Sequence, residues 1–189
     1  TPAPLATVTG WIDQVGAVGD HTVGAPAEQP PHVVGVVHGP HLRDAALAVH
    51  LAESEAESAL MDATSGPFAE AWTNRGIPLP ALPGRSPVAW LEEHGVLGER
   101  TLAIHAVRAD VLDVSRLVAT RTSVAHCPLS NRRHGHGAAP LAAFLEAGLR
   151  VGVGTDSVAS VGRLDLLAEA RAARTLAGLS AAEALGLVT

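Results

Sequence analysis

Short apolar segments alternate with amphipathic segments along most of the chain, and this pattern predicts a parallel α/β fold. Apolar runs without strict alternation are typical of parallel strands, which we expect to be covered on both faces. Strands are predicted at 33–37, 46–49, 101–104, 123–125 and 149–154. Helices are predicted at 53–60, 86–95, 109–119, 140–146 and 164–176, and a capping box at 180–183 begins another.

Proline and glycine are frequent between residues 65 and 85, so we expect mostly loop there, or a lid. The 189 residues fit one domain, 1–189. The chain begins without methionine and ends without an obvious closing element, so we expect an excerpt of a longer domain that lacks its N-terminal strands.

Side chains that can bind metal or move protons stand where four of the predicted strands end. They are His50, with Glu53 three residues later, then His105, His126 and Asp156. In a βα barrel the carboxyl ends of the strands converge on one mouth, where metal ligands and catalytic groups belong. The sequence therefore predicts an active site at this end of the strands.

Each of these residues also has a simpler interpretation when it is taken alone. Glu53 would favour the dipole of a helix start, and Asp156 would cap one. An isolated histidine behind an apolar strand is most often a core residue. For four further residues we also prefer a structural interpretation over a functional one. We expect Cys127 to be a packing residue, Asn131 to be part of a turn, and His134 and His136 to be solvated loop residues.

Composition narrows the classes of partner. The formal net charge is −6, with thirteen arginines and no lysine, which gives no electrostatic reason to expect nucleic acid. Cys127 is the only cysteine, so CxxC-type zinc sites are excluded. No apolar run approaches the roughly 20 residues of a membrane span, and the first residues given lack the basic and apolar regions by which a signal peptide would be predicted. We expect a cytoplasmic protein with a small-molecule substrate, no nucleic-acid or membrane partner, and a homodimer as an open alternative to the monomer.

Several motifs together resemble the amidohydrolase superfamily, in particular its deaminase and chlorohydrolase branch. They are His50-Leu-Ala-Glu-Ser54, Ile104-His-Ala106, Ala125-His-Cys-Pro-Leu-Ser-Asn131 and Gly152-Val-Gly-Thr-Asp-Ser-Val-Ala-Ser160. The last motif is most similar to aminodeoxyfutalosine deaminase-like proteins. The resemblance implies part of a (β/α)₈ TIM barrel, approximately strands 4–8, and hydrolysis of a C–N bond, with deamination of an aminated purine or related heterocycle as the expected reaction.

By position, the resemblance makes His50 and Asp156 metal ligands and Glu53 the proton shuttle. His105 would polarise the attacked carbon or hold the attacking water, and Asp156 would also accept a proton from it. His41 matches a histidine that faces substrate in relatives. One divalent metal is implied, zinc first and iron second, because the lysine that bridges two metals in binuclear relatives has no counterpart here.

The chain departs from the family pattern in two places. No His-x-His pair stands at a strand end, and residues 41–47 leave little room for the crossover helix that relatives carry. These departures keep two alternatives open: a chlorohydrolase or amide hydrolase of the same superfamily, and a catalytically inactive barrel remnant.

Overall fold

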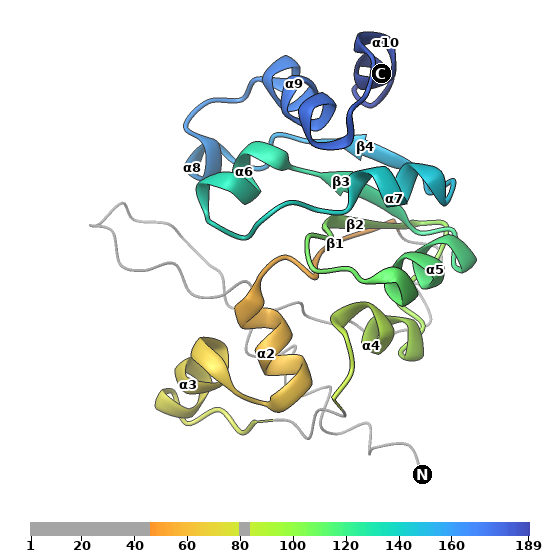
Figure 1. Ribbon diagram of the computed structural model, residues 1–189. Coiled ribbons are helices and arrows are strands. Elements are labelled where there is room, and N and C mark those ends of the chain that lie inside the picture. Colours follow the sequence, from red (N-terminus) through yellow and green to blue (C-terminus); the bar gives the residue numbers. More distant parts are fainter. Residues whose placement is uncertain (1–45, 80–83) are drawn as a thin grey trace. The chain divides into compact units, whose positions relative to one another are not determined.

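The computed structural model describes residues 46–79 and 84–189, which lie in one compact unit, Ala46–Thr189 (Figure 1). Its sheet has four parallel strands in the order β1-β2-β3-β4. They are β1 (Leu47–Leu51), β2 (Thr101–His105), β3 (Ser123–His126) and β4 (Val151–Val153). Strands adjacent in sequence are adjacent in the sheet, as in a sector of a barrel. The predicted α/β fold is confirmed, whereas the strand predicted at 33–37 lies outside the described residues.

Helices fill each connection between the strands. Between β1 and β2 lie α2 (Glu55–Ala63), α3 (Gly66–Asn74) and α4 (Pro87–Glu93); between β2 and β3 lies α5 (Val111–Ala119). Between β3 and β4 lie α6 (Pro128–Arg133) and α7 (Leu141–Glu146), and after β4 follow α8 (Val158–Val161), α9 (Leu166–Ala177) and α10 (Ala181–Gly186). Helix α4 packs on α5, and α9 packs on α6, α7, α10 and β4.

The predicted helix starts are confirmed by their hydrogen bonds. The Ser86 hydroxyl accepts from the amide of Ala89 at the start of α4. Ser180 and Glu183 form the reciprocal capping box that starts α10. Each cap satisfies amide donors that a helix leaves unpaired at its first turn.

The prediction of mostly loop at 65–85 is wrong for its first half, where α3 forms. Pro67 stands in the first turn of α3, where a helix loses no hydrogen bond to proline. Ala69 and Trp72, three residues apart, are buried on one side of the helix. Burial of this apolar face stabilises the helix more than the proline and glycine of the segment destabilise it.

The strands are not equally covered on their two faces. Thr101 and Ala103 of β2 are buried, but Leu102 between them is 37% exposed. Because successive strand residues point to opposite faces, the expectation of two covered faces is wrong at this strand. The buried core gathers Ala103, Val124, Leu117 and Phe144.

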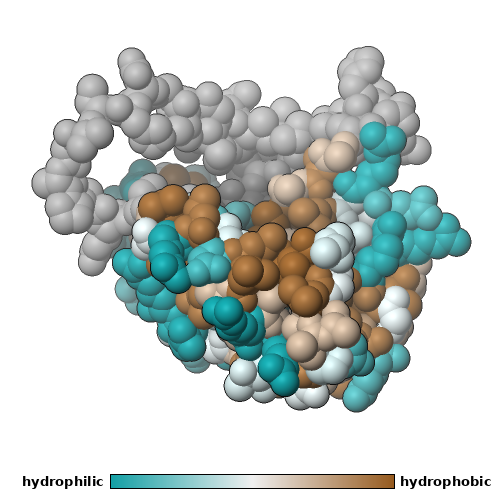
Figure 2. Space-filling view, turned by 90° about the horizontal axis from the view of Figure 1, so that it is seen from above, coloured by the Kyte–Doolittle hydropathy of each residue, from teal (hydrophilic) through white to brown (hydrophobic). Residues whose placement is uncertain are grey.

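Apolar side chains also remain exposed on the helices that follow β4 (Figure 2). On and just before α9 and α10 they are Leu164, Leu166, Leu167, Leu176 and Leu185. None of the helices in 46–79 and 84–189 has the length and apolar character that crossing a bilayer requires.

Candidate metal and active site

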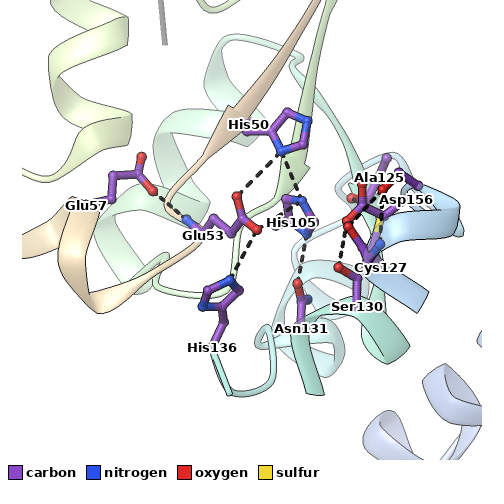
Figure 3. Close-up of polar contacts among 12 residues, drawn as sticks. His50, Glu53, Glu57, His105, Ala125, Cys127, Ser130, Asn131, His136 and Asp156 are labelled. Atoms are coloured by element: carbon purple, nitrogen blue, oxygen red, sulfur yellow. Dashed lines mark hydrogen bonds and ion pairs between the residues drawn. The ribbon is translucent and has the colours of Figure 1, made fainter. Parts of the chain in front are cut away.

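Three of the predicted site residues meet at the carboxyl ends of β1 and β2 (Figure 3). The Nδ1 atom of His50 lies 3.2 Å from Nε2 of His105 and 3.5 Å from Oε2 of Glu53. Oε1 of Glu53 lies 3.5 Å from the same Nε2 of His105. Strand pairing produces this arrangement, because Leu51, the residue after His50, is in register with His105.

The backbone is strained around this group. Among the described residues other than glycine, six have positive φ, and four of these six stand at or just after strand ends: Ala52, His105, Ala106 and Asp156. Such conformations cost roughly 1–3 kcal/mol each and persist only where surrounding contacts enforce them. Two such contacts are the bonds from the Ala106 amide to the Leu51 carbonyl and from the Arg108 amide to the Ala52 carbonyl. Strain gathered at one edge is typical of a functional site.

The charges at the site are coupled. The hydrogen bond with Glu53 raises the pKa of His50. Burial raises the pKa of Glu53, but the hydrogen bond with His50 and the neighbouring imidazoles lower it more, so its net pKa is below the ordinary value. Burial lowers the pKa of His105, whose side chain is fully buried. The site thus favours a neutral His105 beside an ionised Glu53.

Asn131 fixes the tautomer of His105. Its Oδ1 lies 2.8 Å from Nδ1 of His105 and can only accept a hydrogen bond, so Nδ1 of His105 carries the proton and donates. Its Nδ2 lies 3.4 Å from Nδ1 of His126 and donates to it. A neutral His105 with its proton on Nδ1 presents a lone pair at Nε2, toward His50 and Glu53. The proposed catalytic imidazole is therefore an acceptor on the side that faces the site.

Replacing Asn131 by leucine is expected to lower the free energy of unfolding by about 1–3 kcal/mol, because buried nitrogens of His105 and His126 lose their partner. The measurement is urea unfolding followed by circular dichroism. Asn74→Leu, at an exposed position, is the matched control and should change stability by less than about 0.5 kcal/mol. Equal stabilities for the two variants would contradict the role given to Asn131.

Asp156 reaches the same edge from the loop after β4. Ser130, in α6, donates to Oδ2 of Asp156 at 2.6 Å. Burial raises the pKa of Asp156, and the hydrogen bonds from Ser130 and Ser160 overcome this and lower it. The Asp156 charge adds to the rise in the pKa of His50 and offsets part of the lowering that burial causes in the pKa of His105. Asp156 lies outside the tight group formed by His50, Glu53 and His105, whose ligand atoms are all within 4.8 Å of one another.

The remaining expectations have mixed outcomes. His126 and Cys127 are buried, as the simpler interpretation of each predicted; burial lowers the pKa of His126 to about 4 and raises that of Cys127 to about 12. Within the described part of the chain, Nε2 of His126 is buried without a hydrogen-bond partner. Asn131 is not in a turn but in α6. His41, predicted to face substrate, lies outside the described residues.

His136 is the clearest correction. It was expected to be solvated, yet its Nε2 lies 3.4 Å from Oε1 of Glu53 and its side chain is only 24% exposed. A loop with positive φ at Gly135 and Gly137 brings it there, while His134 stays exposed with its ring stacked on His136. Glu53 is therefore surrounded by three imidazoles, and Figure 3 shows them on different sides of its carboxylate.

The donor set fits a divalent cation. A lone pair of His105, an imidazole nitrogen of His50 and a carboxylate oxygen of Glu53 point into one small space. Lone pairs this close repel unless a proton or a cation lies among them, and imidazole nitrogen with carboxylate oxygen is a ligand set that zinc accepts. The carboxylates of Glu53 and Asp156 raise the pKa of His50, and their negative charge would also favour a cation at this edge.

Known proteins show similarity to most of this chain. The profile of the amidohydrolase family matches residues 41–189. A 5-methylthioadenosine/S-adenosylhomocysteine deaminase of Pelotomaculum thermopropionicum is 42% identical over 104 residues, which are 55% of this chain and 24% of that protein. The chain thus spans about a quarter of that relative's length.

Solved structures agree on the fold. A zinc-bound adenosine deaminase from Xanthomonas campestris matches with a TM-score of 0.59 at 27% identity, over 75% of this chain and 30% of that chain. Guanine deaminase of E. coli matches with a TM-score of 0.63 at 23% identity, over 79% of this chain and 32% of that chain, which shows the fold alone. The predicted fold class, part of a TIM barrel, is confirmed. Since the family profile covers well over half of its residues, the chain belongs to the amidohydrolase family.

Proposed function

We propose that this protein hydrolyses a C–N bond with the help of one divalent metal ion, and that its reaction is deamination of an aminated purine or a related nucleoside. The observation that carries the proposal is the convergence of His50, Glu53 and His105 within 4.8 Å. Relatives named as deaminases of adenosine derivatives give the substrate class.

Of the groups at this edge, His50 and Asp156 would hold the ion, while Glu53 and His105 would act on the attacking water; the ion is zinc in the Xanthomonas campestris adenosine deaminase. When bound, a divalent cation would lower the pKa of water to about 7 and so supply hydroxide at neutral pH. Asp156 is suited to a ligand role because the hydrogen bonds from Ser130 and Ser160 keep it ionised. The side chain of His50 is 39% exposed and so accessible to an incoming ion.

Glu53 would move the protons. It takes one from the attacking water, and the water oxygen bonds to the ring carbon that carries the amino group. Glu53 passes that proton to the adjacent ring nitrogen; the remaining hydroxyl proton of the adduct is then transferred to the amino group as the C–N bond breaks, so that ammonia leaves and a carbonyl forms on the ring. The ionised state of Glu53 is favoured by the imidazoles around it, which makes it a base at the start of the reaction.

His105 would accept a hydrogen bond from the attacking water. Of the two roles open from the family resemblance, its lone pair at Nε2 supports this one, since a neutral imidazole protonated on Nδ1 has nothing to donate on the reacting side. Asn131 keeps the ring in this orientation. Cytoplasmic location and a homodimer stay predictions.

The test is a substrate screen with the zinc-loaded protein. Ammonia release is measured with S-adenosylhomocysteine, 5-methylthioadenosine, adenosine and guanine, with and without a chelator. The proposal predicts chelator-sensitive ammonia release from at least one of them. Release of chloride from a chlorinated heterocycle, or of a carboxylate from an amide, with no ammonia from any purine, would replace deamination by the corresponding alternative. Absence of both turnover and bound metal would favour the inactive remnant.

A further inference from the structure

Glu57 stands one helical turn beyond Glu53 and contacts the backbone that carries it (Figure 3). Its Oε1 accepts from the amide of Ala52 at 2.9 Å, and its Oε2 accepts from the amide of Glu53 at 2.7 Å. We propose that Glu57 is a positioning residue, which fixes the turn between β1 and α2 and thereby places the Glu53 carboxylate against His50 and His105. The catalytic consequence of this proposal rests on the proposed function, but the positioning does not.

The contact differs from ordinary helix capping. Ser54 is the N-cap of α2 and accepts from the Glu57 amide at 3.2 Å. In a capping box the side chain at the position of Glu57 would return to the amide of the N-cap residue itself. Here its two oxygens also bind the amides of the two residues before Ser54, which a helix start does not require. The carboxylate therefore serves the turn rather than the helix alone.

The turn needs such a partner because its backbone is unfavourable. Ala52 has φ of 50°, a region that residues with a Cβ atom rarely adopt, and it is fully buried. Its carbonyl accepts from Arg108 at 2.7 Å on the side of β2, while its amide is held by Glu57. The turn is thus attached to β2 by one group and to α2 by the other. Moving either attachment would move Glu53 relative to His105.

Substitution of Glu57 by glutamine tests the positioning role directly. Glu57→Gln keeps the size of the side chain but leaves one oxygen to accept, because the amide nitrogen can only donate. One of the two backbone amides therefore loses its partner. We expect kcat to fall about 10- to 100-fold with KM changed less than about three-fold, the loss typical when a group that orients an active residue is removed. Glu55→Gln makes the same change of charge at an exposed position in the same turn and should alter kcat less than about two-fold.

Two readouts do not depend on any substrate. Hydrogen exchange of the peptide that contains Ala52 and Glu53 should become at least about ten-fold faster in Glu57→Gln and stay unchanged in Glu55→Gln. Titration of the metal-free protein with Zn²⁺ should show the same stoichiometry in both variants. Glu57→Asp, which keeps the charge on a shorter side chain, should give an intermediate exchange rate and remains informative if the glutamine variant fails to fold.

The outcomes separate the two proposals. Unchanged exchange at 52–53 in both position-57 variants would overturn the positioning role, whatever the activity. Faster exchange with wild-type kcat would also overturn it, because the turn would then be free to move without effect on Glu53. Faster exchange in a protein whose wild type releases no ammonia from any purine would support the positioning role and reject the proposed function.

Discussion

Glu53→Gln is expected to keep zinc bound while kcat falls by about 10²- to 10⁴-fold, the contribution typical of a positioned general acid–base group. Glutamine keeps an oxygen near Nδ1 of His50 and Nε2 of His105, so the space between them stays polar. It cannot take up a proton from water, and it cannot pass one to a ring nitrogen. Catalysis should therefore be lost without loss of the site.

The measurement combines steady-state ammonia release with zinc content from elemental analysis on the same sample. Glu70→Gln, at an exposed position in α3, is the matched control and should keep both values within about two-fold of wild type. Wild-type kcat in Glu53→Gln would refute the proton-shuttle assignment. Loss of zinc together with activity would instead make Glu53 a metal ligand, a role that its place in the tight three-residue group allows.

His50→Ala should remove zinc and activity together. His50 is a proposed metal ligand whose Nδ1 lies 3.2 Å from Nε2 of His105 and 3.5 Å from Oε2 of Glu53, and alanine offers no donor atom in place of the imidazole. We expect the Kd for Zn²⁺ to rise by more than the 10- to 100-fold typical for loss of a group that merely supports a ligand. Turnover should fall to the uncatalysed background.

The control for this variant is His134→Ala. His134 is an exposed imidazole in the loop that also carries His136, and its ring stacks on that of His136, which is outside the three-residue group. Its replacement should leave Zn²⁺ affinity within about three-fold of wild type. Equal Zn²⁺ affinity in His50→Ala and wild type would place the metal elsewhere and remove His50 from the site.

The sequence was sufficient for residues whose surroundings are local. His50 and His105 end apolar runs, and a strand end in a parallel sheet has only one edge at which to place them. Ser86, followed by proline, and Ser180, followed by glutamate three residues later, predict the starts of helices α4 and α10 from adjacent residues alone. In each case a few neighbouring residues determine the outcome, so one sequence contains the whole signal.

Residues that act through distant partners could not be found in this way. Asn131 bonds His105 across 26 positions, and Ser130 bonds Asp156 across the same separation. Their types are those of ordinary loop residues, and nothing beside them indicates the partner. His136 is similar, since glycine neighbours indicate a loop but not the carboxylate that the loop approaches.

Glu57 is the exception, because a signal was available. The spacing Ser54-x-x-Glu57 is that of a capping box, which indicates that the Glu57 side chain turns back toward the strand end. The spacing does not predict that the carboxylate also accepts hydrogen bonds from the amides of Ala52 and Glu53, because those bonds depend on the backbone conformation of the turn. Helix α3 could not be predicted for a similar reason, because the burial of Ala69 and Trp72 that stabilises it depends on residues distant in sequence.

Crystals grown with zinc give the most direct test of the central claim, by an anomalous-difference map recorded at the zinc absorption edge. The account predicts a single strong peak among the side chains of His50, Glu53, His105 and Asp156. A peak at His134 and His136 alone, or no peak in zinc-saturated crystals, would contradict it.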